Sequence, residues 1–252
     1  MVRRNDYLRL STALICLIFL LSGLAHAQIF EATSDGNWSN GSTWKNGTSP
    51  GNELNVGETV IITPNTTVSL DQDLTFLGSN AILKVNDTLQ GNQTITVPRG
   101  KIGGNNNSGL LDVNKVVVHS SNVLKLAGEL KANVLEIDAP VNLVQSATLN
   151  VQDTLYLKSG ELEIRGGSDL IGQKNFNLVL ESGTVKGSFA IYSSYNLIFK
   201  GSSRKVPREL LEYDNNINLI VDLDQNSDSI VLNNKIPTDP FTRNIKIRKN
   251  FR

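Results

Sequence analysis

The chain has 252 residues, of which 39% are hydrophobic and 6% aromatic, and its 24 basic residues balance 24 acidic ones. This balance excludes the clustered excess of lysine and arginine that a nucleic-acid-binding surface requires. Cys16 is the only cysteine, and it lies close to the N-terminus. A disulfide framework and a cysteine-rich zinc site are therefore excluded.

The first 27 residues have the pattern of a secretory signal peptide. Three arginines come first: Arg3, Arg4 and Arg9. Residues 10–21 are almost entirely apolar, a run too short to span a bilayer comfortably, and Ala25-His26-Ala27 fits the small-x-small cleavage rule. We predict cleavage after Ala27 rather than an uncleaved membrane anchor. The exported chain would then start at Gln28, carry 21 basic and 23 acidic residues, and have no membrane segment.

Residues 28–64 differ in composition from the rest, because they are polar, rich in glycine and contain both tryptophans, Trp38 and Trp44. A segment of this kind cannot form its own hydrophobic core. We interpret it as an N-terminal cap whose rings cover the open end of the strands that follow. The alternative is a glycan-stacking platform, because exposed tryptophan faces suit sugar rings.

Residues 65–252 are predicted to form the coils of an all-β solenoid. Short runs of alternating apolar residues, such as Val134-Leu-Glu-Ile137 and Thr154-Leu-Tyr-Leu157, are separated by Asn, Gly, Ser and Asp rather than by helices. In the first of these runs we expect Leu135 and Ile137 inside and Glu136 in solvent. Turn-forming asparagines recur at irregular intervals, at positions 114, 122, 133, 142 and 150.

A β-sandwich also has strands at such intervals, so it is the competing fold. Two observations favour the solenoid. Glycine-containing turns are spread along the whole stretch instead of pairing strands into hairpins. Few strands contain the aromatic residues that are typical of a sandwich core. We therefore expect small aliphatic side chains to stack between coils.

The N-terminal segment also carries a family resemblance, through Gly36-Asn-Trp38, Ser42-Thr-Trp44, Pro50-Gly51 and then Val60-Ile-Ile62. This pattern resembles the start of secreted Gram-negative surface proteins exported by type IX secretion, including their eight-glycine domain. Tyr195-Asn-Leu-Ile-Phe199-Lys-Gly201 is similar to a turn common in their repeats. The resemblance implies a right-handed parallel β-helix located at the cell surface or secreted, and it supplies no catalytic residues.

The chain departs from that family in two respects. It has few of the glycines that name the eight-glycine domain, and it has no recognisable C-terminal sorting domain. It ends on a strand-like run, so truncation at the C-terminus stays open as an alternative.

Candidate catalytic groups are few. His119 is the only histidine after the signal segment, so a multi-histidine metal site is excluded there. Ser120 and Ser121 follow it without a Gly-x-Ser-x-Gly nucleophile elbow. We interpret His119 as a turn or surface residue.

Paired carboxylates are the better enzymatic alternative, because glycosidases place two acidic residues beside the scissile bond. The candidates on strand-like runs are Glu129, Glu136, Glu161 and Glu163. Glu161 and Glu163 share one strand face, opposite Leu162 and Ile164. An ordinary exposed sheet shows the same alternation, so we interpret these carboxylates as solvent-facing and assign no catalytic residue.

The segment from Asp222 to Asp228 has oxygen-bearing side chains at alternating positions, as a calcium loop needs. Ser227 stands where an EF-hand loop requires glycine, and Asn233 where it requires glutamate. We interpret the segment as a solvated turn, and we expect no metal and no cofactor.

The sequence thus predicts a secreted or surface-displayed structural or adhesive β-helix without catalysis of its own. The alternative is a polysaccharide-binding or polysaccharide-degrading β-helix protein. The expected partners are extracellular polysaccharide or cell-surface matrix, and the sequence leaves the oligomeric state open.

Overall fold

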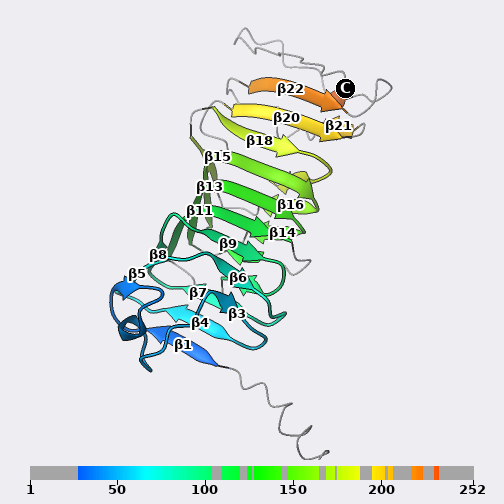
Figure 1. Cartoon of the computed structure of the whole chain (residues 1–252). Helices are drawn as coiled ribbons and strands as arrows, with labels where there is room; N and C mark the ends of the chain where they lie inside the picture. The colour runs from blue at the N-terminus through cyan, green and yellow to red at the C-terminus, as the bar shows by residue number, and fades with distance from the viewer. Residues whose placement is uncertain are drawn as a thin grey trace, which may run out of the picture.

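The computed structural model shows an all-β parallel solenoid, which confirms the fold class predicted from the sequence (Figure 1). The structure describes these residues: 28–103, 109–119, 124–126, 128–143, 147–164, 169–173, 175–187, 195–201, 204–206, 217–223 and 230–232. The predicted signal peptide and most of the candidate calcium loop lie outside them.

The strands belong to four sheets, and every ladder within the sheets is parallel. Sheet A comprises β1 (Ile29–Ala32), β4 (Thr59–Ile62), β7 (Ile82–Val85) and β10 (Lys101–Ile102). Sheet C comprises β12 (Leu124–Leu126), β14 (Val141–Leu143), β16 (Glu161–Ile164) and β19 (Thr184–Gly187). Sheet D pairs β21 (Arg204–Val206) with β23 (Ile230–Leu232).

Sheet B is the largest sheet and extends along most of the solenoid. Its strands are β2 (Gly36–Asn37), β3 (Glu53–Leu54), β5 (Thr67–Ser69), β6 (Leu74–Phe76), β8 (Thr88–Gln90), β9 (Thr94–Val97), β11 (Leu110–Val118), β13 (Glu129–Asp138), β15 (Thr148–Ser159), β17 (Asp169–Gly172), β18 (Phe176–Leu180), β20 (Tyr195–Gly201) and β22 (Ile217–Leu223). A short 3-10 helix, η1 (Gly41–Thr43), lies between β2 and β3.

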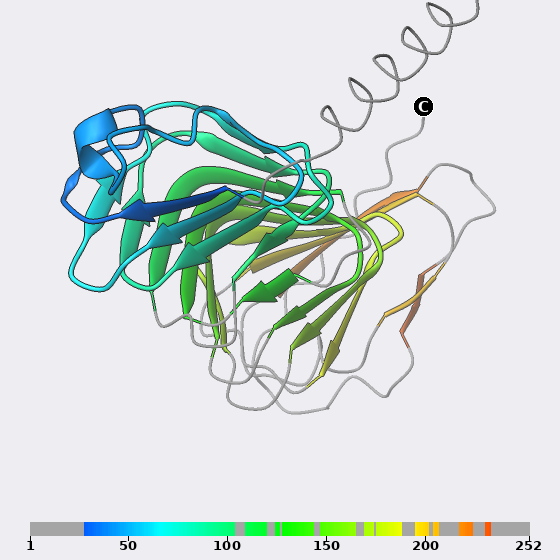
Figure 2. The ribbon, with the colours of Figure 1, turned by 90° about the horizontal axis from the view of Figure 1, so that it is seen from below.

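Each coil passes through one strand of sheet A, sheet C or, at the C-terminal end of the described solenoid, sheet D, and then through sheet B. The early coils place two strands in sheet B, such as β8 and β9, on either side of a bend. In the later coils β11, β13 and β15 run through the bend as single strands, because each pairs at both ends with the neighbouring coils. Viewed along the axis, the coils lie over one another (Figure 2).

The interior is filled by stacks of equivalent aliphatic side chains. One stack runs through Val116, Leu135, Leu155, Leu178 and Leu197, which pair strand to strand and are all buried. Burying such side chains stabilises the fold by about 1.5–3 kcal/mol each relative to leaving them in water. The stacks confirm the prediction that small aliphatic residues, rather than aromatic ones, form most of the core.

The predicted register of Val134-Leu-Glu-Ile137 is confirmed for its inward positions, because Leu135 and Ile137 are 1% and 0% exposed. Glu136 faces outward, as predicted, but it is not freely solvated. Its side chain is only 13% exposed, because lysine side chains of both neighbouring coils fold over it. The expectation that Glu136 stands in open solvent is therefore wrong.

The separate N-terminal cap predicted for residues 28–64 is not confirmed. Strands β1, β2 and β3 of this segment pair in register with β4, β5 and β6 of the next coil. The segment therefore contributes a coil of its own to the sheets, and the long loop from residue 38 to residue 52 contains its tryptophans and η1.

Asparagines 114, 133, 142 and 150 do not form turns, contrary to the sequence-based expectation. All four lie within strands. Asn114 and Asn133 stand at the bend of sheet B, where the ladder between β13 and β15 shifts register at Asn133. The Asn133 amide donates to Asn114 Oδ1 at 2.9 Å, so equivalent amides of successive coils bond to each other. Asn122 lies outside the described residues.

Truncation of the inward stack should destabilise the fold far more than truncation of its neighbour on the outer face. We expect Leu135→Ala to lower the free energy of unfolding by about 2–5 kcal/mol, because it leaves a cavity between two coils. Val134→Ala, on the outward side of the same strand, should cost about 1 kcal/mol or less. Chemical denaturation followed by circular dichroism measures both, and equal costs would contradict the register.

Candidate functional site

The two tryptophans occupy a packed corner of the first coil. Trp38 is 0% exposed and Trp44 is 3% exposed. Their ring centroids lie 5.1 Å apart with the planes at 82°, and Phe30 meets Trp44 edge-on at 6.5 Å. The indole N–H of Trp38 donates to Gly51 O at 2.6 Å, and that of Trp44 donates to Trp38 O at 2.9 Å. Both polar atoms of the buried rings are therefore satisfied.

This geometry bears on the proposed glycan-stacking role of Trp38 and Trp44. A stacking platform presents ring faces to solvent, whereas these two rings are buried and perpendicular to each other. A sugar could stack on either ring only after the corner had opened and broken two indole hydrogen bonds. The arrangement instead favours a stabilising role for the pair.

The four candidate carboxylates are not brought together into one groove. Glu129 and Glu136 lie on β13 on opposite sides of the sheet B bend, and Glu161 and Glu163 lie on β16 in sheet C. Glu129 accepts a hydrogen bond from Asn150 at 3.3 Å, and Glu161 lies 3.6 Å from the Lys186 ammonium. Glu161 and Glu163 share the outward face of β16, but they lie side by side on one strand rather than on the two sides of a scissile bond, as a glycosidase pair does.

Glu136 is the centre of a charged cluster on the outer face of sheet B. Its carboxylate lies 3.1 Å from Lys115 Nζ on β11 and 2.5 Å from Lys158 Nζ on β15. Burial raises the pKa of Glu136, but hydrogen bonds and charge from the two lysines lower it more, so its net pKa lies below the ordinary 4.5. The bond to Glu136 is also the main cause of the raised pKa of Lys158.

Tyr156 extends this cluster toward the later coils. Its hydroxyl donates to Glu181 Oε2, and the Lys158 and Lys200 ammonium groups lie 5.6 and 5.5 Å from its ring centroid. Burial, followed by the Glu181 contact, raises the pKa of Tyr156 to about 12. At neutral pH the cluster therefore holds Glu136 ionised and Tyr156 protonated, and neither group is poised to exchange a proton near pH 7.

His119 lies at the end of β11, exposed, with Nδ1 3.8 Å from Asp138 Oδ2. The other oxygen of Asp138 accepts a hydrogen bond from Ser159 Oγ at 2.5 Å. The carboxylate thus stands between the histidine and the serine, whereas a nucleophilic triad needs histidine in the middle. Ser120 and Ser121 lie outside the described residues. The interpretation of His119 as a surface residue agrees with this placement.

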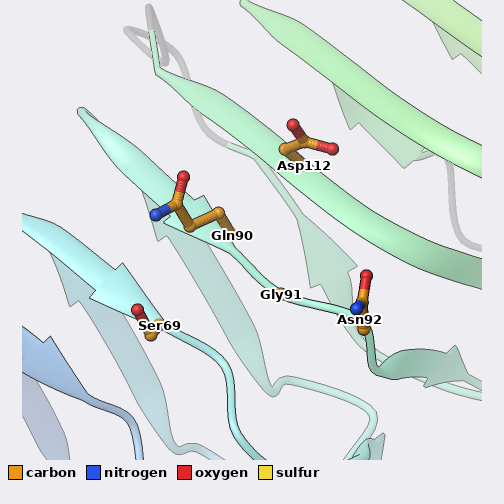
Figure 3. A pocket seen from close by; sticks show the side chains of 5 residues that line it. All are labelled: Ser69, Gln90, Gly91, Asn92 and Asp112. Carbon is orange, nitrogen blue, oxygen red and sulfur yellow. The ribbon is translucent and has the colours of Figure 1, made fainter.

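A shallow polar hollow of about 320 Å³ lies on sheet B at the bend (Figure 3). It is lined by Ser69, Gln90, Gly91, Asn92 and Asp112. Ser69 ends β5, Gln90 ends β8, and Asp112 lies on β11, and these positions pair with one another in the sheet. Gly91 permits the close approach of coils here, because a Cβ on it would lie only 2.3 Å from Leu70 O.

Sequence reasoning missed this hollow. Ser69 and Gln90 are ordinary polar residues at strand ends and Asp112 lies within β11, so none of the three stands out in the sequence. The signal that could have revealed them is their spacing, since Ser69, Gln90 and Asp112 recur at close to the length of one coil. That spacing acquires meaning only when the pairing of the coils is known.

Among the described residues, no three or more His, Cys, Asp or Glu side chains are grouped so that they could hold a metal ion. Over the same residues, no helix has the length and apolar character needed to cross a membrane. The fold defines a parallel β-solenoid protein whose outer face carries clusters of charged and polar side chains. Comparison of the chain with protein-family models, curated proteins and solved structures finds no match.

Removal of one ring of the tryptophan corner should destabilise the protein. We expect Trp44→Ala to lower the free energy of unfolding by about 3–5 kcal/mol, as for the loss of a buried aromatic side chain. Thermal unfolding measures the effect, with binding to a polysaccharide panel measured in parallel. An unchanged melting temperature together with lost glycan binding would instead support the stacking platform.

Loss of the Glu136 carboxylate should destabilise the protein in a pH-dependent way. Glu136→Gln should cost about 1 kcal/mol at neutral pH, because it leaves two lysines close together without a counter-charge. Because the folded-state pKa of Glu136 lies below its ordinary value of 4.5, this contribution is complete above pH 4.5 and is lost as the pH falls through the folded-state value.

Denaturation curves at a series of pH values and salt concentrations test this expectation. The difference between wild type and Glu136→Gln should narrow in acid and in high salt. Glu53→Gln, on an exposed carboxylate of β3, is the matched control and should have little effect. A cost that does not change with pH would contradict an electrostatic role for Glu136.

Proposed function

We propose that the chain is an exported structural or adhesive module, displayed at the cell surface or released, without catalysis of its own. The observation that carries this proposal is the set of polar links that run from coil to coil along the outer face. The Glu136 carboxylate on β13 pairs with Lys115 on β11 and with Lys158 on β15. Lys131 Nζ on β13 lies 2.6 Å from Asp112 Oδ2 on β11.

Such links suit a rigid spacer or binding surface. They run in the same direction as the main-chain ladders, so they resist bending between neighbouring coils. The carboxylates in these links are paired with lysine side chains, and Glu136 remains ionised at neutral pH. A hydrolytic site would need one protonated and one ionised carboxyl group facing a common substrate.

Export is supported by the sequence pattern of residues 1–27 and by the absence of cysteine after Cys16. N-terminal sequencing of the exported protein should give Gln28 as the first residue. A membrane-bound form that retains Met1 would contradict the assignment.

Attachment assays test the proposed role. Cells that lack the chain should attach less well to a surface coated with their own extracellular polysaccharide, and re-expression should restore attachment. Protease treatment of intact cells should remove an epitope placed on the chain. The purified protein should release neither reducing ends nor unsaturated products from a polysaccharide panel. Product release would overturn the proposal in favour of a polysaccharide-degrading enzyme.

A further inference from the structure

We propose that the polar hollow on sheet B binds an extended, neutral glycan chain that lies along the solenoid axis. The inference rests on the proposed adhesive function and names the class of ligand that this function would use. The hollow spans three successive coils, because it contains Ser69 of β5, Gln90 of β8 and Asp112 of β11 (Figure 3).

The register of sheet B continues this row beyond the hollow in both directions. Asn37 pairs with Ser69 on one side, and Asp112 pairs with Lys131 and then with Asn150 on the other. The outward side chain at each position is polar. Neighbouring strands lie about 4.8 Å apart, so the row offers a hydrogen-bonding group at that interval along the axis. A linear polymer of sugar rings presents hydroxyl groups at a similar repeat.

The side chains within the hollow are available to a ligand. Those of Ser69, Gln90 and Asn92 make no hydrogen bond to any other residue that the structure describes, and Gln90 and Asn92 are exposed. Beside the hollow, but not lining it, the Gln93 side-chain oxygen is buried without a hydrogen-bond partner among the described residues. An open hollow lined by unused polar side chains can offer several hydrogen bonds to a ligand from solvent.

The main chain of the hollow is not available, which argues against an added peptide strand. Ser69 O accepts from Trp38 N at 2.8 Å, Gln90 O accepts from Leu70 N at 2.7 Å, and Asp112 O accepts from Gly91 N at 2.8 Å. A peptide that binds by strand addition needs free main-chain groups at a sheet edge. A ligand here must therefore be recognised by side chains.

The chemistry of these side chains favours hydroxyl groups. Serine, glutamine and asparagine each both donate and accept hydrogen bonds, as a sugar hydroxyl does. The Asp112 carboxylate only accepts, and it disfavours a uronate or sulfate at the same point. The Lys131 ammonium lies 2.6 Å from the Asp112 carboxylate and balances its charge, so the site does not favour cationic ligands either. A neutral polyhydroxyl chain matches this set best.

Affinity electrophoresis of the full chain in gels that contain soluble polysaccharides tests the proposal. Neutral chains of several linkages (hydroxyethyl cellulose, galactomannan, xyloglucan and laminarin) are compared with polygalacturonate, each with and without EDTA. The test variants are Gln90→Ala and Asn92→Ala. The matched control is Asn86→Ala, the same substitution two residues before β8 instead of two residues after it.

We expect at least one neutral polysaccharide to retard the wild-type protein, with or without EDTA. Gln90→Ala and Asn92→Ala should each weaken binding about fivefold, the equivalent of one hydrogen bond, and Asn86→Ala should not. Equal retardation of wild type and both test variants, stronger binding to polygalacturonate, or loss of binding in EDTA would each overturn the proposal.

Failure of this inference can be told apart from failure of the proposed function. If no polysaccharide in the panel retards the protein while cells still need it for attachment, glycan binding at the hollow is contradicted and the adhesive function is retained. If a polysaccharide is cleaved, the proposed non-catalytic function falls.

Discussion

Each coil of this solenoid hydrogen-bonds to the next with its residues in register, so equivalent side chains lie above one another along the axis. In the interior, this register places the inward apolar residue of each strand above its equivalent in the previous coil. The result is continuous aliphatic stacks, such as that of Val116, Leu135 and Leu155. One inward charge would interrupt contacts with two coils at once. The register therefore controls stability as strongly as composition does.

The same constraint acts on the outer face, where it brings polar side chains together that are about one coil apart in sequence. Glu136 reaches lysines on both neighbouring coils, and the Asn196 amide donates to Asn177 Oδ1 at 2.9 Å. At these points the polar groups satisfy each other. Ser69, Gln90 and Asn92 differ, because they line a hollow and make no such bond within the described chain. That contrast supports the proposal that the hollow binds a ligand.

The sequence predicts the fold well because the decisive pattern is local. Alternation within a few residues places Leu135 and Ile137 inside and Glu136 outside, whatever the rest of the chain does. The lysine partners of Glu136 and the row through the hollow depend on the length of each coil, which varies and which no short motif records. Asn114 and Asn133 show the limit of local reasoning, since residues typical of turns stand within bent strands and bond to each other.

The tryptophan corner of the first coil lies next to the polar hollow on the coils that follow, so a stabilising element adjoins the proposed recognition surface. Trp38 N donates to Ser69 O, so the buried corner is joined directly to the first residue that lines the hollow. Both indole rings are buried, and the side chains that line the hollow are polar. Recognition at this surface would therefore depend on several modest hydrogen bonds repeated from coil to coil. Such a mode favours long, repetitive ligands over small ones, because affinity then grows with the number of coils engaged.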